Sequence, residues 1–148
     1  TLFETGSKKE VALSFASQED RDIGFAAMAS NLWNIWYYTV SNCLDVGAVD
    51  IKAFPLGLAT MDAKTRAQIS AKARELNAHI KKKSFIAERN YVKAGAVSTL
   101  QINMRQSKDL IDEIDKLMAP HYGFDSNELD FIINYDIRYR LADEEDGD

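Results

Sequence analysis

Apolar residues recur at intervals of three and four positions along most of this chain, and that spacing predicts amphipathic helices. Residues 18–41 follow it directly after Ser17, a helix-capping residue type whose next neighbours include acidic residues. One long helix is therefore expected there. A second helix is expected over residues 61–82, with Thr60 or Asp62 as its N-cap. Its apolar side is a narrow stripe of Ile69, Ala73, Leu76 and Ile80.

Two further helices are expected in the last third of the chain. The first begins after Ser107, its N-cap, and ends at Pro120. The second is short and is capped by Asp125 or Ser126. Its buried side is expected to carry Leu129, Ile132 and Ile133.

Other stretches alternate between apolar and polar residues or are rich in β-branched residues, which predicts strands. Residues 8–16 are expected to form one strand. Residues 85–92 and 97–102 flank a central glycine, which favours a hairpin; a helix continuing to about residue 92 is the alternative. The expected fold class is α+β and predominantly helical, with long helices and a small β element, the hairpin around residues 85–102.

The chain has 148 residues, which fits one domain or one domain with an appended helical piece. Apolar residues make up 46% of it, enough for a packed core. Its single cysteine, Cys43, excludes a disulfide framework and fits a cytoplasmic protein. Cys43 is expected to be a small buried side chain. No apolar run is long enough to span a bilayer, so no membrane contact is expected.

Charge is distributed unevenly, although the net charge of the chain is only −5. Residues 62–93 hold nine Lys and Arg against three acidic residues, a net of +6. Residues 109–148 hold thirteen acidic residues against three Lys and Arg, a net of −10. The basic middle fits a solvated helix face and, equally, a face that attracts phosphate.

Acidic residues beside a lysine, as at residues 112–116, are one requirement of a metal-dependent nuclease. Asp112 and Asp115 lie three positions apart and share a helix face, whereas Glu113 points elsewhere. A solvated helix face is therefore the favoured interpretation. The two histidines are far apart and lack a further ligand at metal-binding spacing. The sequence predicts no catalytic residue and no metal ligand.

Three segments near the carboxyl end read IDEIDKLM at residues 111–118, HYGF at residues 121–124 and ELDFIINYDIRYR at residues 128–140. In this order they resemble the carboxyl-terminal end of large bacterial restriction-modification DNA methyltransferases of the adenine-modifying, type IIG-like group. The resemblance is long and ungapped. It implies that this chain is a piece of such an enzyme.

A second resemblance lies at residues 50–56, which read DIKAFPL and are followed by a polar helix containing Gln68 and Ile69. This resembles the exit from a target-recognition domain, found in the same methyltransferases and in the specificity subunits of type I restriction systems. The stretch before it, residues 41–45, departs from the family pattern.

Together the resemblances imply a non-catalytic part of a longer parent, which agrees with a chain that starts at Thr1 rather than methionine. Residues 1–58 would complete a target-recognition domain, residues 59–140 a helical carboxyl-terminal region, and residues 141–148 a disordered acidic tail. S-adenosylmethionine is expected in the parent. This chain has neither the Gly-rich loop nor the Asn-Pro-Pro-aromatic motif that adenine methylation requires.

The expected partners are double-stranded DNA, bound through the parent protein, and the catalytic domain of the same polypeptide. Lys and Arg neutralise phosphates, and Asn and Arg also read base edges. Three consecutive lysines cannot share one helix face, so their contact with phosphate is favoured over base reading. The candidate DNA-binding residues are Lys81, Lys82, Lys83, Arg89, Asn90 and Lys93.

The alternative is a helical interaction module of the same system that makes no direct contact with DNA. Its partner would be another subunit or a second copy of this chain, giving a homo-oligomer. In that case the surface that pairs is the stripe of Ile69, Ala73, Leu76 and Ile80.

Overall fold

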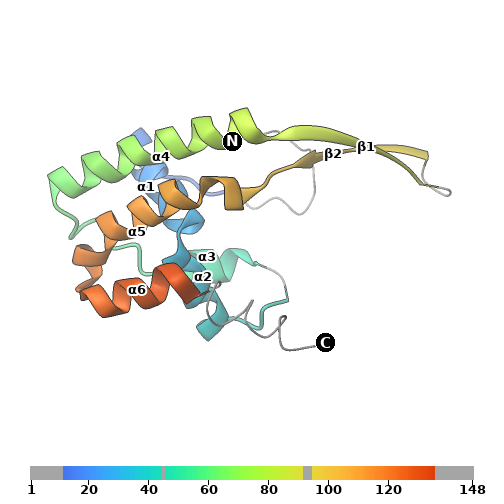
Figure 1. The fold of residues 1–148 in the computed structure, drawn as a ribbon. Helices are drawn as coiled ribbons and strands as arrows, with labels where there is room; N and C mark the ends of the chain where they lie inside the picture. Colours follow the sequence, from blue (N-terminus) through green and yellow to red (C-terminus); the bar gives the residue numbers. More distant parts are fainter. Residues whose placement is uncertain (1–11, 45, 92–94, 136–148) are drawn as a thin grey trace.

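The structure of the protein, a computed structural model, describes residues 12–44, 46–91 and 95–135 (Figure 1). Within these residues the predominantly helical α+β class is confirmed, and so is the hairpin. The elements in chain order are α1 Gln18–Ala29, α2 Asn31–Val40, α3 Ala48–Ala53, α4 Ala63–Lys83, β1 Phe85–Tyr91, β2 Gly95–Gln101, the 3-10 helix η1 Met104–Ser107, α5 Lys108–Tyr122 and α6 Ser126–Tyr135.

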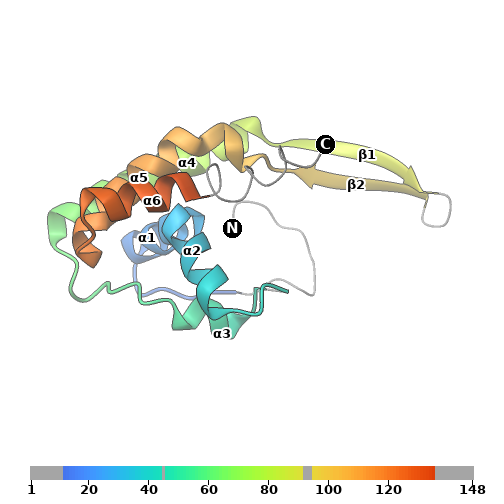
Figure 2. The same ribbon diagram turned by 60° about the horizontal axis from the view of Figure 1, so that its bottom comes forward.

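The helices pack on one another, and the hairpin projects from them. α4 lies against α1 and α5, while α2 packs against α6. In both views the two strands continue beyond the end of α4 and project away from the helices (Figures 1 and 2). Because β1 follows α4 and β2 leads into η1 and α5, the hairpin is an arm rooted between the two longest helices.

The expected apolar stripe of α4 lies at the centre of the core. Ile69, Ala73, Leu76 and Ile80 are each at most 3% exposed, and they share one apolar cluster with residues of α1 and α5. Because the chain fills this stripe itself, the stripe is not free to pair with another subunit, and the interaction surface expected there is wrong. The same cluster holds residues from both sides of position 58. The expected domain boundary at that position stays a prediction.

The strand expected over residues 8–16 is wrong for its described part, since residues 12–16 form no strand; residues 8–11 lie outside the described residues. The alternation has another cause. Leu13 and Phe15 are half-buried while their neighbours are exposed. The ring of Phe15 lies so close to Gly24 of α1 that a Cβ there would collide with it. One side of an extended segment thus covers α1 without pairing to a strand.

The single helix expected over residues 18–41 is two helices that meet at Ser30. Ser17 caps α1 as expected, accepting a hydrogen bond from the Asp20 amide at 3.0 Å. Ser30 has extended backbone angles and interrupts the ladder. Its hydroxyl donates to the Ala27 carbonyl at 2.6 Å and accepts from the Trp33 amide at 3.1 Å, so it serves both helix ends. A serine can compete with the helix in this way because its side chain replaces backbone partners.

Replacing Ser30 with alanine is expected to lower the free energy of unfolding by about 1–2 kcal/mol, because both hydrogen bonds are lost in a fully buried position. Urea unfolding followed by circular dichroism measures the change. Ser17→Ala is the matched control: it removes an exposed N-cap and should cost roughly half as much. Equal costs for the two variants would contradict the double role of Ser30.

The second expected helix is confirmed in its start, since Asp62 caps α4 through the Thr65 amide at 3.0 Å. α5 begins after Ser107 as expected, but the Ser107 hydroxyl lies 2.9 Å from Nδ1 of His79 instead of capping the helix. This contact joins α4 to α5 beside the root of the arm.

Pro120 does not end α5, contrary to expectation; it lies within the last turn, and the helix ends at Tyr122 with Gly123 as its C-cap. The φ of Gly123 is 76°, a left-handed conformation that glycine adopts without strain. The Phe124 amide then donates to the Ala119 carbonyl at 3.0 Å, which satisfies a terminal acceptor. Termination here is set by glycine and not by proline.

α6 begins as expected after Asp125, whose Oδ1 accepts from the amides of Asn127 and Glu128 at 2.7 and 2.9 Å. Ile132 is buried, and Leu129 and Ile133 are half-buried. The acidic tail at residues 141–148 lies outside the described residues.

Candidate nucleic-acid interface

The three consecutive lysines occupy the last turn of α4, where the arm begins. Lys81, Lys82 and Lys83 are all exposed. Ser84 closes the helix: its amide and hydroxyl both donate to the Ile80 carbonyl, at 2.9 and 2.6 Å. Cations are favourable at a helix carboxyl end, where the backbone carries partial negative charge. Within the described residues, no acidic side chain forms an ion pair with these lysines.

The register of the hairpin separates the two other described candidates. In the antiparallel pair, Arg89 lies opposite Val97 and Asn90 lies opposite Ala96. Neighbouring residues of a strand point to opposite faces, so the side chains of Arg89 and Asn90 cannot meet one surface together. Their contact with DNA stays a prediction. Lys93 lies outside the described residues.

Neither face of the hairpin is covered by the body of the protein. No described side chain of β1 or β2 is buried, and Phe85 and Ile86 are 62% and 69% exposed at the base of the arm. A two-stranded hairpin is only marginally stable in water by itself. Both faces of the arm are therefore open to solvent.

One basic residue of α4 that the charge count included is used inside the protein. Arg66 pairs with Glu19 and Asp20 of α1 and donates to the Leu58 carbonyl at 2.9 Å. The hydrogen bond from Arg66 lowers the pKa of Asp20 below its ordinary value. Arg66 thus fastens α4 to α1 and is not available to a phosphate.

Arg74 is also engaged, with the buried carboxylate of Asp22 at 3.1 Å. Ser70, itself buried, donates to the same carboxylate at 3.1 Å. The net charge of +6 over residues 62–93 therefore does not describe one surface. Some of its cations pair with acids of α1 and α5, Lys64 is exposed near the start of α4, and the others lie towards the arm.

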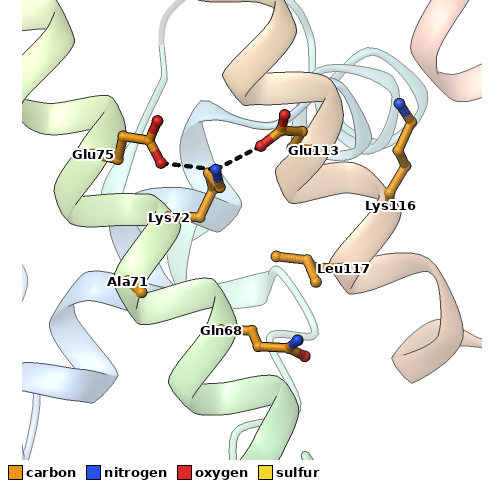
Figure 3. A pocket seen from close by; sticks show the side chains of 7 residues that line it. All are labelled: Gln68, Ala71, Lys72, Glu75, Glu113, Lys116 and Leu117. Carbon is orange, nitrogen blue, oxygen red and sulfur yellow. Dashed lines mark hydrogen bonds and ion pairs between the residues drawn. The ribbon is translucent and has the colours of Figure 1, made fainter.

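An open groove of about 520 Å³ runs between α4 and α5, and Figure 3 shows its lining side chains. Lys72 lies between two carboxylates there, 2.7 Å from Glu75 and 2.6 Å from Glu113 (Figure 3). The hydrogen bonds to these acids raise the pKa of Lys72, that to Glu113 most. The groove is thus an ion-paired seam between two helices.

The acidic residues weighed as a nuclease centre have another role. Asp115 is 2% exposed, so the solvated face expected for it is wrong. Its carboxylate accepts from the amides of Asn31 and Leu32, both at 3.2 Å, at the start of α2. The Asn31 side chain donates to Asp115 at 2.7 Å and to Asp112 at 3.1 Å, which confirms that these two acids share a face. In the described part of the chain, no group of three His, Cys, Asp or Glu is placed to hold a metal ion.

Two residues have positions that the sequence did not predict. Arg105 is exposed in η1, which packs against α4, and it therefore belongs to the root of the arm. The only sequence signal for this position was its place four residues after the end of the second strand. Cys43 is exposed, not buried, with a φ of 56°. It lies in the loop after α2, and the apolar character of a side chain does not decide whether it is buried in a loop.

The residues from the end of α4 to the end of η1 therefore carry an unusual charge. Residues 78–107 hold six Lys and Arg against Glu88 alone, a net of +5 in a chain whose total is −5. No helix in the described ranges is both long and apolar enough to cross a bilayer. The chain matches no protein-family model, no curated protein and no solved structure.

Proposed function

We propose that this chain is a non-catalytic, DNA-contacting part of a restriction-modification adenine methyltransferase, and that it binds double-stranded DNA through its basic arm. One observation carries the proposal: the exposed lysines Lys81, Lys82 and Lys83 have no described acidic partner, whereas Arg66, Lys72 and Arg74 of the same helix do. Unpaired cations at the base of an uncovered β-ribbon are suited to a polyanion.

The shape of the arm supports the same ligand. A two-stranded β-ribbon fits the major groove of B-DNA, which is roughly 12 Å wide. Seven residues in each strand extend for roughly 23 Å at about 3.3 Å per residue. With the ribbon in the groove, the lysines and Arg105 at its root lie at the level of the backbone phosphates.

Catalysis belongs to another part of the parent in this proposal. The catalytic domain of the same polypeptide binds S-adenosylmethionine and holds the target adenine, and the present chain contributes additional contacts to the duplex. A bacterial restriction-modification enzyme meets its DNA in the cytoplasm, which is where the proposal places this chain.

Replacing Lys81, Lys82 and Lys83 together with glutamine is expected to weaken duplex binding and to flatten its dependence on salt. About four phosphate contacts make affinity fall roughly 100-fold between about 50 and 200 mM salt, and one remaining contact makes it fall only about fourfold. Fluorescence anisotropy of a labelled duplex measures both quantities.

The matched control replaces three exposed lysines away from the arm, as Lys52→Gln, Lys64→Gln and Lys116→Gln together. This variant has the same net charge as the first, so a loss that depends only on total charge appears in both. A wild-type chain that does not bind duplex DNA at low salt would reject the proposal.

That result would favour the second candidate, an assembly module without DNA contact. A specific feature favours a protein partner: Leu44 and Val49 are 82% and 80% exposed, beside Val46 at 49%. Solvent-facing apolar residues near one another are typical of protein interfaces. The buried stripe of α4 has no part in this version of the candidate.

A further inference from the structure

The hairpin has two chemically different faces, because residues that pair across an antiparallel ladder point to the same side. One face, called the Arg89 face, is made of the pairs Phe85–Gln101, Ala87–Thr99 and Arg89–Val97. The other, called the Glu88 face, is made of the pairs Ile86–Leu100, Glu88–Ser98 and Asn90–Ala96. Both are uncovered by the helices.

Charge distinguishes the two faces. Arg89 is the one charged residue among the pairs of its face, and Glu88 is the one charged residue among the pairs of the other. Both side chains are exposed, and neither is in an ion pair within the described residues. A duplex presents phosphates on both walls of its grooves, so an inserted ribbon gains from a cation at the groove floor and loses from a carboxylate there.

Besides Arg89, the Arg89 face carries two side chains of types that read base edges, Thr99 and Gln101. Arginine bonds to guanine in two places, glutamine to adenine, and the threonine methyl group contacts the thymine methyl. Thr99 is exposed and Gln101 is half-buried at the root. Gln101 pairs with Phe85, and Arg89 lies four residues after Phe85 on β1. Arg89 and Gln101 are therefore roughly 13 Å apart along the ribbon, which is about four base steps.

The geometry points to the Arg89 face as the surface that reads the major groove of double-stranded DNA, with Arg89, Thr99 and Gln101 as its specificity-determining residues. This inference rests on the proposed function. The lysines of the root hold the phosphates and set affinity, while the Arg89 face lies on the base edges. The Glu88 face, with Asn90, is turned away from the bases.

The chain offers a direct test, because Thr99 and Ser98 are neighbours on opposite faces and Cys43 is its only cysteine. In a Cys43→Ser background, Thr99→Cys and Ser98→Cys place one thiol on each face with little change in size. Maleimide labelling is timed with and without a saturating duplex of about 20 base pairs. Labelling is expected to slow roughly tenfold at Thr99→Cys and less than twofold at Ser98→Cys, because only the first thiol is enclosed by the groove.

Duplex affinity, measured in the same samples, distinguishes a failure of the proposed function from a failure of the face assignment alone. If the wild-type chain does not bind the duplex, the proposed function fails and the face assignment fails with it. If it binds and the two thiols are slowed equally, or only that of Ser98→Cys is slowed, the face assignment is overturned while phosphate binding by the lysines stands.

A second pair of variants gives the same answer without cysteines. Arg89→Ala is expected to weaken binding to the preferred duplex roughly 5- to 50-fold and to reduce its preference over other sequences. Asn90→Ala, on the adjacent position of the other face, should change affinity less than about twofold. A larger effect at Asn90 than at Arg89 would overturn the assignment.

Discussion

Replacing Leu76 with alanine is expected to lower the free energy of unfolding by about 2–5 kcal/mol, the range measured for leucines in well-packed cores. Leu76 is fully buried in the middle of the α4 stripe, and it belongs to the cluster in which α4 meets α1 and α5. Truncation removes the apolar contacts of the side chain and leaves a cavity that three helices cannot close without moving. Urea unfolding of the purified chain measures the loss as a shift of the midpoint.

Leu44→Ala is the matched control, because it makes the same chemical change at a leucine that is 82% exposed. Its expected cost is below about 0.5 kcal/mol. The comparison also decides the use of the stripe. If Leu76→Ala has the same urea midpoint as the wild type, Leu76 is not packed in the core of the chain. That result would contradict the burial of the stripe.

Stability is also expected to fall as the pH rises from about 4 to 6, through the titration of Asp115. Burial raises the pKa of Asp115 to about 6, from the ordinary 3.8, against the opposing effect of the hydrogen bonds from Asn31 and Leu32. Between these values the folded chain holds a proton that the unfolded chain has lost. The stability that this bound proton contributes is therefore complete below about pH 3.8 and is lost as the pH rises through about 6. Its size is about 3 kcal/mol, at 1.36 kcal/mol per pKa unit.

The measurement compares the wild type with Asp115→Asn at several pH values by urea unfolding. The amide does not titrate, and the other acidic groups are common to both chains; among them Asp112, whose charge helps to raise the pKa of Asp115, is the one that the substitution affects directly. The wild type should lose about 2–3 kcal/mol relative to the variant between about pH 4 and pH 7. A difference that stays constant, or that grows in favour of the wild type, would show that the carboxylate is not buried.

Local signals were sufficient for the parts of the fold that local interactions decide. The Asp62 cap, the stripe of α4 and the glycine-centred hairpin each follow from residues within a few positions of one another, and each is confirmed. The break at Ser30 was missed because a serine within an apolar run is compatible with one continuous helix. Its buried hydroxyl becomes a double cap only when α1 and α2 turn against each other.

The candidate site, too, was predictable only where it depends on residues that are close in the sequence. The lysine run is visible in the sequence, but the loss of Arg66 and Arg74 to acids of α1 depends on partners about 50 positions away. That Arg89 and Asn90 lie on opposite faces follows from the alternation of a strand, and their contact with DNA stays a prediction. Asp115 was assigned to solvent because no local pattern announces its contact with α2.

That contact has a consequence for the order in which the chain folds during synthesis. The amides that open α2 find their acceptor 84 residues later, at Asp115. A ribosome adding about 5–20 residues per second needs roughly 4–17 seconds to cover that distance. A ten-residue helix is too short to persist in water without such support. α2 therefore gains this support on a growing chain only after Asp115 has left the ribosome.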